Sequence, residues 1–362
     1  GYVRATETQE FTFEYQGDKT TQAVYEFTFE DVQTSVELSK ADLTDGKELP
    51  GASLQVLDST GTVVEEWIST EEPHMIRGLL VGETYTLVET KPADGYTTAE
   101  SIEFKVEDTA EVQKHQMLDD VTKVEISKTD VTDSKEIPGA KLTILDKDGK
   151  VVESWVSDKD PHMVEKLPVG TYTLREEQAP DGYLVAEEVS FEVKDTGEIQ
   201  KVEMKDARPV GKLVLKKTDA EDGSPLAGAE FELRIKKSGK VVATLVTDEE
   251  GVATSVDIPI ATYKDGKMKK EIEYILVETK APDGYVRSEK EESVVFTYQD
   301  DKTKEIEITK ELTNERIPTG GYVKSPKTGD DTNIWLPIFL LVLSVGGIAG
   351  IFWYTKKKNH EE

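Results

Sequence analysis

The sequence predicts an all-β protein built from tandem antiparallel β-sandwich domains and followed by a single C-terminal transmembrane helix. Three observations carry this prediction. Apolar and polar residues alternate over many short segments, similar segments recur at nearly constant spacing, and one long uncharged apolar run lies near the C-terminus. Turns rich in Asp and Gly separate the alternating segments, which gives each repeat about seven short strands, as in β-sandwich domains.

Composition limits the possible functions. The chain has 362 residues and a net charge of −29. This length suits more than one domain, and the charge argues against a nucleic-acid partner, because phosphate binding requires basic surfaces. The chain has no cysteine, although small exported domains often depend on disulfides, so another kind of cross-link is expected. Because the chain starts at Gly1 without a signal peptide while its C-terminus looks exported, we expect that an N-terminal part is missing from it.

Two sequence elements recur in three copies. The first is an alternating segment that ends in Lys-x-Asp, and the second has the pattern Tyr-x-Leu-x-Glu. The copies of the first element are 36–42, 124–130 and 213–219, and those of the second are 85–89, 172–176 and 274–278. The residues from Gly1 onward also align without gaps with those from Gly284 onward. A fourth, truncated copy therefore leads the chain.

These repeats predict the domain organisation. Residues 1–33 are the C-terminal remnant of a preceding β domain, and residues 34–120, 121–208 and 209–315 are three β-sandwich domains, of which the third is longer. After them come a spacer at residues 316–334, which contains the motif 325–329, a predicted transmembrane helix at residues 335–354 and a basic tail at residues 355–362.

The apolar run at 335–354 carries no charge. As a helix it would span roughly 30 Å, the thickness of the hydrocarbon core of a bilayer. Three consecutive lysines, 356–358, follow the run and place the tail on the cytoplasmic side. A buried core helix is the alternative, but the length of the uncharged run and the lysines that close it favour a membrane span.

Ser325, Pro326, Lys327, Thr328 and Gly329 precede this run. Motif, apolar span and basic tail, in this order, resemble the LPxTG sorting signal of Gram-positive wall proteins, with Ser325 in place of the family's Leu. The resemblance implies a membrane-inserted precursor, attack by a sortase cysteine on the carbonyl between Thr328 and Gly329, and transfer to a peptidoglycan amine. The expected location is the cell wall of a Gram-positive bacterium. A plain single-pass membrane anchor is the alternative.

The repeats themselves resemble SpaA-type prealbumin-fold domains, which are related to the B-type (Cna-B) repeats of collagen adhesins and occur in Gram-positive adhesins and pilins. The resemblance covers nearly the whole ectodomain and implies Ig-like/prealbumin-like sandwiches with a self-formed isopeptide bond. In such a domain a Lys of the first strand joins an Asp or Asn of the last strand, and the Glu of Tyr-x-Leu-x-Glu promotes the reaction. The matching residues are the lysines Lys40, Lys128 and Lys217, the acceptors Asp119, Asp206 and Asn314, and the acids Glu89, Glu176 and Glu278.

Strand parity places these groups inside each domain. Lys40 follows two apolar residues by even steps, so its side chain shares their face. In the third copy Lys217 has this parity and Lys216 does not. The leading remnant supplies Asp31, which aligns with Asn314 but lacks a Lys partner. We therefore expect Asp31 to be an orphan acceptor that cannot be cross-linked within this chain.

Burial supplies the chemistry of such a site. In an apolar core the pKa of a Lys falls, so that a neutral amine can attack. The pKa of a Glu rises, so that a protonated acid can polarise the acceptor carbonyl and relay protons. An Asp acceptor would lose water and an Asn acceptor ammonia. Each domain would react once, so no enzyme activity is expected beyond this self-modification. The alternative is a buried ion pair that never reacts.

No other chemical site is predicted. His74 and His162 are expected to make loop contacts rather than to bind zinc, and no cofactor, metal or catalytic residue is expected. The leading hypothesis is a wall-anchored stalk or adhesin segment that displays an N-terminal functional region. Two alternatives stay open. One is a host-matrix adhesin or pilin, whose domains bind a host surface ligand or polymerise through a lysine such as Lys324. The other is an anchor for an upstream extracellular enzyme.

Overall fold

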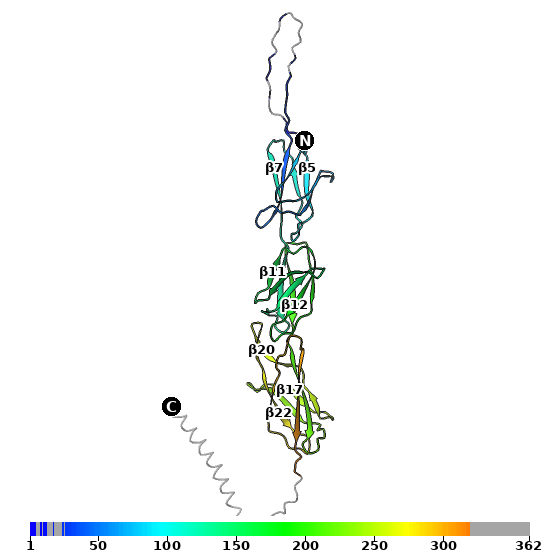
Figure 1. The fold of residues 1–362 in the computed structure, drawn as a ribbon, viewed down its shortest axis with the longest axis vertical. Helices are drawn as coiled ribbons and strands as arrows, with labels where there is room; N and C mark the ends of the chain where they lie inside the picture. Colours follow the sequence, from blue (N-terminus) through cyan, green and yellow to red (C-terminus); the bar gives the residue numbers. More distant parts are fainter. Residues whose placement is uncertain (5–7, 9, 13–16, 18–23, 25, 319–362) are drawn as a thin grey trace, which may run out of the picture. The chain divides into compact units, whose positions relative to one another are not determined.

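The computed structural model describes residues 1–4, 8, 10–12, 17, 24 and 26–318. The named elements among them are all strands, which confirms the all-β prediction. Over this part of the chain, no helix has both the length and the apolar character that crossing a membrane requires. Lys324, the predicted motif at 325–329 and the predicted helix at 335–354 lie outside the described residues. Gly1–Glu315 form one unit, and its strands fall into three modules (Figure 1).

Module 1 contains two sheets, with the strand orders β4-β1-β7 and β3-β2-β5-β6. Their facing side chains, such as Val36 and Leu87, form a single buried cluster. The strands are β1 (Ser35–Asp42), β2 (Ser53–Leu57), β3 (Val63–Ile68), β4 (His74–Arg77), β5 (Thr84–Lys91), β6 (Ile102–Lys105) and β7 (Val112–Asp119).

Module 2 repeats this topology, with the strand orders β11-β8-β14 and β10-β9-β12-β13. Its core again combines side chains of both sheets, such as Ile126 and Leu174. The strands are β8 (Lys123–Asp130), β9 (Lys141–Leu145), β10 (Val151–Val156), β11 (His162–Glu165), β12 (Gly170–Gln178), β13 (Val189–Val193) and β14 (Ile199–Asp206).

Module 3 keeps the two sheets and adds a hairpin. In the first sheet β15 pairs with β18, β19 and β24, the second has the order β17-β16-β22-β23, and β20-β21 is the added hairpin. The strands are β15 (Val210–Asp219), β16 (Glu230–Ile235), β17 (Val241–Val246), β18 (Val252–Thr254), β19 (Ile258–Pro259), β20 (Ala261–Lys264), β21 (Lys267–Glu271), β22 (Glu273–Lys280), β23 (Glu292–Val295) and β24 (Glu305–Asn314). The hairpin explains why the third sequence repeat is longer.

The first and last strands of each module pair in parallel, and among the described strand pairs they are the one departure in each module from the antiparallel pairing predicted from the sequence. β1 pairs with β7 so that Lys40 lies opposite Met117 and Asp42 opposite Asp119, and β8–β14 and β15–β24 pair in the same way. Parallel neighbours need a long crossover. The second sheet supplies it, because the chain passes through that sheet before it returns beside its first strand. The C-terminal ends of the first and last strands therefore meet.

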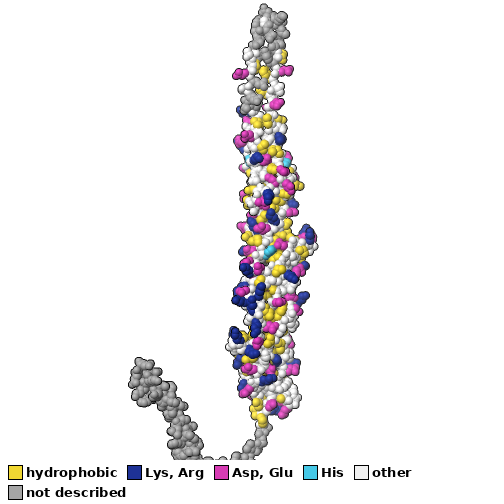
Figure 2. Space-filling view, turned by 60° about the vertical axis from the view of Figure 1, so that its left-hand side comes forward, with side chains coloured by type: hydrophobic (Ala, Val, Ile, Leu, Met, Phe, Trp, Pro, Cys, Tyr) yellow, Lys and Arg dark blue, Asp and Glu magenta, His cyan; other side chains and the backbone are white. Residues whose placement is uncertain are grey.

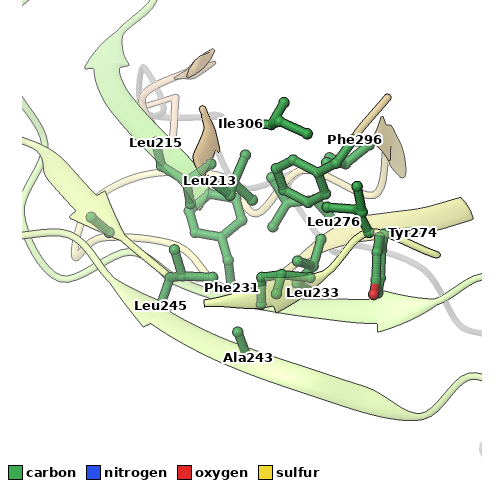
Figure 3. Packing of buried hydrophobic residues seen from close by; sticks show 14 of the residues in the cluster. Leu213, Leu215, Phe231, Leu233, Ala243, Leu245, Tyr274, Leu276, Phe296 and Ile306 are labelled. Carbon is green, nitrogen blue, oxygen red and sulfur yellow. The ribbon is translucent and has the colours of Figure 1, made fainter. Parts of the chain in front are cut away.

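Alternation along the strands creates the cores. In module 3, Leu213 and Leu215 of β15 lie against Phe231, Tyr274 and Phe296, and none of the five side chains is more than marginally exposed (Figure 3). Burying a side chain of this size contributes roughly 1.5–3 kcal/mol. On β16, Glu230 and Glu232 alternate with the fully buried Phe231 and Leu233 and are only partly buried, and charged side chains of both signs are spread over the face shown in Figure 2. Each module thus has a core of its own to hold its polar groups in place.

The described residues before module 1 contain no named strand. Tyr2 forms an isolated bridge with Gln33, and Val3 N donates a hydrogen bond to Val32 O over 2.8 Å. Asp31, the predicted orphan acceptor, is exposed. It therefore lacks the enclosed surroundings that the other three acceptors have.

Candidate functional site: a buried lysine, acid and acceptor in each module

The first strand of each module carries a lysine inside the core. The side chains of Lys40, Lys128 and Lys217 are 2%, 1% and 1% exposed. Each sits on the apolar face because the period-2 alternation of its strand runs through it. Lys216, one residue from Lys217, points outward with 53% of its side chain exposed. Burying an ammonium group is costly, so each lysine must be either neutral or closely paired.

In module 1, Lys40 of β1 meets two acids. Lys40 Nζ donates a hydrogen bond to Asp119 Oδ1 at the end of β7 and lies 2.9 Å from Glu89 Oε1 on β5 of the other sheet. Glu89 Oε2 accepts a hydrogen bond from Ala99 N over 2.6 Å, which fixes the carboxyl group. The two sheets thus bring together residues that are far apart in sequence.

Module 2 has the same arrangement. Lys128 Nζ donates a hydrogen bond to Asp206 Oδ1 and lies 3.3 Å from Glu176 Oε2. Ala186 N donates to Glu176 Oε2 over 2.7 Å. All three acidic and basic side chains are buried.

Module 3 has an amide where the others have an acid. Lys217 Nζ donates a hydrogen bond to Asn314 Oδ1, and Asn314 Nδ2 donates to Glu278 Oε1 over 2.9 Å. Glu278 Oε2 accepts from Ser288 N over 2.6 Å, and Lys217 Nζ lies 3.7 Å from Glu278 Oε1. The lysine also lies 5.8 Å from the centroid of the Phe231 ring. The structure therefore brings the three predicted site residues together in every module.

The two Asp modules contain acid oxygens that lack a partner. Asp119 Oδ2, Asp206 Oδ2 and Glu176 Oε1 are buried and have no hydrogen-bond partner among the described residues. Leaving such an atom unsatisfied is costly. A proton shared between the Asp and the Glu would satisfy both carboxyl groups, as the Asn314 amide hydrogen does in module 3. The geometry thus favours a protonated acid pair.

The pKa shifts agree with this protonation state. Burial raises the pKa of Asp119 to about 7, against the attraction of Lys40 and with support from Glu89. Burial lowers the pKa of Lys128 to about 8, although Glu176 opposes the change. Burial also raises the pKa of Glu176 and lowers that of Lys217. Each shift moves its group toward the neutral form, in which the amine is a nucleophile and the acid a proton donor.

A second recurring buried set was missed by the sequence analysis. Tyr96 Oη donates a hydrogen bond to Asp42 Oδ2 over 2.7 Å, and Tyr183 Oη donates to Asp130 Oδ2 over 2.8 Å. In module 3 Tyr285 donates to Asp219 over 2.7 Å. The signal was present in the sequence, because an Asp follows two residues after each site lysine and a Tyr ends each Asp-Gly-Tyr turn.

The histidines lie in strands and not in loops, which corrects the expectation for them. His74 begins β4 and His162 begins β11. Their rings stack on Trp67 and Trp155 with centroid distances of 4.2 and 4.4 Å. Within the described residues, no group of three or more His, Cys, Asp or Glu side chains is arranged to hold a metal ion.

Comparison with known proteins identifies solved structures and a protein family that resemble this chain. Among solved structures, the chain is similar to the Bacillus anthracis TIE protein, with 27% sequence identity and a TM-score of 0.52 over 79% of this chain and 51% of that chain. The chain thus spans about half the length of the TIE protein structure. It is also similar to BcpA, the major pilin subunit of Bacillus cereus, with 19% identity and a TM-score of 0.44 over 79% of this chain and 100% of that chain.

A further similar structure is the shaft pilin SpaA from Lactobacillus rhamnosus GG, with 14% identity and a TM-score of 0.26 over 49% of this chain and 98% of that chain. Among curated proteins no match was found. The model of the SpaA family, described as a prealbumin-like fold domain, matches residues 34–120, 122–208 and 211–312. Since these segments make up well over half of the chain, the protein belongs to the SpaA prealbumin-like fold family and carries three such domains in tandem.

Proposed function

We propose that this chain is a cell-wall-anchored surface stalk or adhesin segment whose modules are locked by intramolecular Lys–Asp and Lys–Asn isopeptide bonds. The observation that carries the proposal is the contact between a buried lysine amine, a buried Glu and a carboxyl or amide acceptor in all three modules. A single buried pair is weak evidence of chemistry, because ion pairs also occur in cores. The same contact recurs in three modules, and in two of them buried acid oxygens have no hydrogen-bond partner among the described residues. Together these observations support a reaction better than a single buried pair would.

The reaction balances without a co-reactant. The neutral amine of Lys40 attacks Cγ of Asp119, the tetrahedral intermediate loses water, and a secondary amide remains. In module 3 the same attack on Asn314 expels ammonia. The Glu donates a proton to the acceptor oxygen or to the leaving group and takes one back from the amine, so it is regenerated. Each module reacts once, so the lysine, acid and acceptor do not make the protein an enzyme.

The bonds would replace the disulfides that this cysteine-free chain cannot form. Each would join the first strand to the last strand and close a loop that contains most of its module, for example between Lys40 and Asp119. Closing a loop of this size stabilises a fold by restricting the unfolded chain, by about 4.5 kcal/mol on the loop-entropy scale. An amide is also indifferent to the redox state of the surroundings, which suits a surface structure.

Anchoring is the second part of the proposal. Residues 325–329 supply the sorting motif, and the apolar run 335–354 with the lysines after it would hold the precursor in the membrane until a sortase transfers Thr328 to peptidoglycan. The support is sequence alone: the order of motif, span and basic tail. Thr328→Ala should move the protein from the wall fraction to the membrane fraction of a host that displays it. An unchanged wall fraction would refute sortase anchoring.

Intact-mass spectrometry of residues 1–315 tests the cross-links. The expected mass is that of the sequence minus two molecules of water and one of ammonia. Replacing Lys40, Lys128 and Lys217 by Arg in one variant provides the control, which should keep the unreacted mass. An unreacted mass for the native segment would leave three buried ion pairs and no covalent lock.

A further inference from the structure

The Asp–Tyr pairs of modules 1 and 2 are buried sites at the end of the first strand. Asp42 and Asp130 are 7% and 0% exposed. Each also accepts a backbone hydrogen bond within its own turn, from Thr44 N over 2.7 Å and from Thr132 N over 2.7 Å. Burial opposes ionisation of both aspartates, but the hydrogen bonds outweigh it and lower the pKa of each. Both sites therefore hold a buried negative charge that attracts a cation.

A lysine from module 2 supplies the cation for module 1. Lys166, in the turn between β11 and β12, places Nζ 3.2 Å from Asp42 Oδ2 and 2.6 Å from Tyr96 Oη. The same Nζ lies 4.8 Å from the centroid of the Tyr96 ring. The lysine thus contacts both members of the Asp–Tyr pair, across the boundary between two modules.

An arginine between modules 2 and 3 fills the equivalent site of module 2. Arg208 lies between β14 and β15, and its Nε and Nη2 lie 2.7 and 2.6 Å from Asp130 Oδ2. Its guanidinium carbon lies 4.0 Å from the centroid of the Tyr263 ring on β20. The hairpin that only module 3 has among the described modules thus places an aromatic ring against the guanidinium.

The backbone of Lys166 shows that its position is constrained. Its φ is +63°, a conformation that L-residues adopt at a cost, and the equivalent position in module 1 is Gly78 with φ +80°. A lysine in place of glycine at this turn is unfavourable for module 2 by itself. The contacts of its side chain with Asp42 and Tyr96 offer the compensation.

Close backbone contact accompanies the cation. A Cβ on Gly95 would lie 2.4 Å from Lys166 O, so only glycine fits there. Thr122 N donates a hydrogen bond to Gly95 O over 3.0 Å, and Thr122 Oγ1 donates its single hydrogen to Leu167 O over 2.6 Å. The boundary is therefore a packed joint and not a free linker.

The boundary before module 1 offers an internal comparison. Thr34 N donates to Gly1 O over 3.3 Å and Thr34 Oγ1 to Leu79 O over 2.6 Å, which repeats the bonds of Thr122. Gly78 stands there in the place of Lys166 and has no side chain. Both boundaries therefore have the backbone contacts, whereas the side-chain cation that reaches an Asp–Tyr pair is present at the second boundary.

The joint between modules 2 and 3 has further contacts. Tyr263 Oη donates a hydrogen bond to Gly182 O over 2.5 Å, and the rings of Tyr183 and Tyr263 meet edge to face at 5.2 Å. A Cβ on Gly182 would lie 2.6 Å from Cβ of Met268 on β21. The hairpin β20-β21 therefore packs on the turn that holds the Asp–Tyr pair of module 2.

We propose that the buried Asp–Tyr pair at the end of a module is a receptor for an ammonium or guanidinium group supplied by the chain that follows. Lys166 and Arg208 are the two ligands, and each holds one module at a fixed angle to the next. The proposal does not depend on the isopeptide bonds, since Asp42 and Asp130 take no part in them.

Spin-label distances test the receptor in residues 1–315. The chain has no native cysteine, so Glu71→Cys and Lys159→Cys, two exposed sites in successive modules, would carry the only labels. A narrow distance distribution is expected for the native joint. Lys166→Gly, which restores the module 1 residue and relieves the backbone, should broaden it, and so should Tyr96→Phe. Lys201→Gln is the matched control, because Lys201 pairs with Glu125 2.9 Å away inside module 2.

The outcomes are distinct. An equally narrow distribution in Lys166→Gly and Tyr96→Phe would overturn the proposal, and intact mass, measured in parallel, reports the isopeptide bonds independently.

Arg208→Gln should broaden the distances between labels at Lys159→Cys and Glu249→Cys. Because half of the Lys166 side chain is exposed, added salt should broaden the first joint more than the second, where the Arg208 side chain is 24% exposed. An equal response of both joints to salt would contradict the assigned ligands.

Discussion

Asn314 Nδ2 donates a hydrogen bond to Glu278 Oε1 over 2.9 Å. In the two Asp modules the corresponding oxygens, Asp119 Oδ2 and Asp206 Oδ2, have no hydrogen-bond partner among the described residues. An amide always carries the hydrogen that a carboxyl group carries only when it is protonated. The identity of the acceptor therefore offers a direct test of the chemistry.

Asp119→Asn should still be cross-linked, because the new amide can donate to Glu89 as Asn314 does to Glu278. Loss of ammonia from Asn and loss of water from Asp give the same amide. The reacted variant should therefore have the same intact mass as the reacted native chain. Asp120→Asn is the control, since Asp120 pairs with Lys123 over 2.8 Å, and its mass should shift by the substitution alone. A variant mass that exceeds the mass of the reacted native chain by one ammonia would contradict the prediction.

Glu176→Ala should leave module 2 without its bond while modules 1 and 3 react, because Glu176 is the only carboxyl group other than Asp206 beside Lys128 Nζ in the described structure. The mass should rise by one water relative to a fully reacted variant. The free energy of unfolding of the module should fall by about 4.5 kcal/mol on the loop-entropy scale. Glu177→Ala is the matched control, because Glu177 faces solvent and pairs with Arg175. Complete reaction in Glu176→Ala would show that this acid is dispensable.

The stability of an unreacted module 1 should fall as the pH rises. Lys40→Met removes the amine, so that no amide can form, but keeps Asp119 and Glu89. Burial is the largest cause that raises the pKa of Asp119 to about 7, Glu89 adds to it and Lys40 opposes it, so without Lys40 the folded state keeps a proton that the unfolded state releases above about pH 4. This stabilisation is complete below about pH 4 and is fully lost only as the pH rises through about 7 and above. Urea unfolding over this range measures the effect, with the native chain as the control, in which the proposed amide would consume Asp119 and the pH dependence should be flatter. A free energy of unfolding that rises with pH would contradict the prediction.

Gly95→Ala should destabilise the joint between modules 1 and 2 more than Gly51→Ala destabilises module 1. Both glycines have positive φ, +86° and +99°, so both substitutions cost about 1 kcal/mol in backbone strain. Only the Cβ at position 95 meets another group, Lys166 O, and nothing lies within 4 Å of one at position 51. We expect an additional loss of about 1–3 kcal/mol for Gly95→Ala in urea unfolding. Equal losses for the two variants would argue against a packed joint.

Much of this architecture could be predicted because it depends on local sequence. Alternation with period 2 identifies the inward face of a strand, so it distinguishes Lys217 from Lys216 without knowledge of the fold. Recurrence of the same pattern three times gives tandem all-β domains, which the family match confirms. Lys40, Glu89 and Asp119 were grouped because each belongs to a recurring element, although their contacts span the two sheets of the module.

The rest depends on contacts that alternation does not encode. Whether β7 runs parallel or antiparallel to β1 is decided by the path of the chain between them, and short antiparallel hairpins were the wrong guide to it. The pairing of Asp42 with Lys166 joins two modules, and nothing in either segment indicates how closely the modules approach. The extra length of the third repeat was visible, but not that it forms β20-β21 and packs on Tyr183.

The parallel pairing of β1 and β7 has a mechanical consequence. Tension passed along the chain reaches module 1 at Ser35 and leaves it at Asp119. Once Lys40 and Asp119 are joined, the tension follows only the short stretch from Ser35 to Lys40 and one amide, and the remaining residues of the module bear none of it. A β-strand is already almost fully drawn out, at about 3.3 Å per residue, so this stretch contains no slack. A cross-linked module would therefore neither creep nor lengthen under steady load, and any extension of the chain under that load would come from segments outside the stretches that bear it.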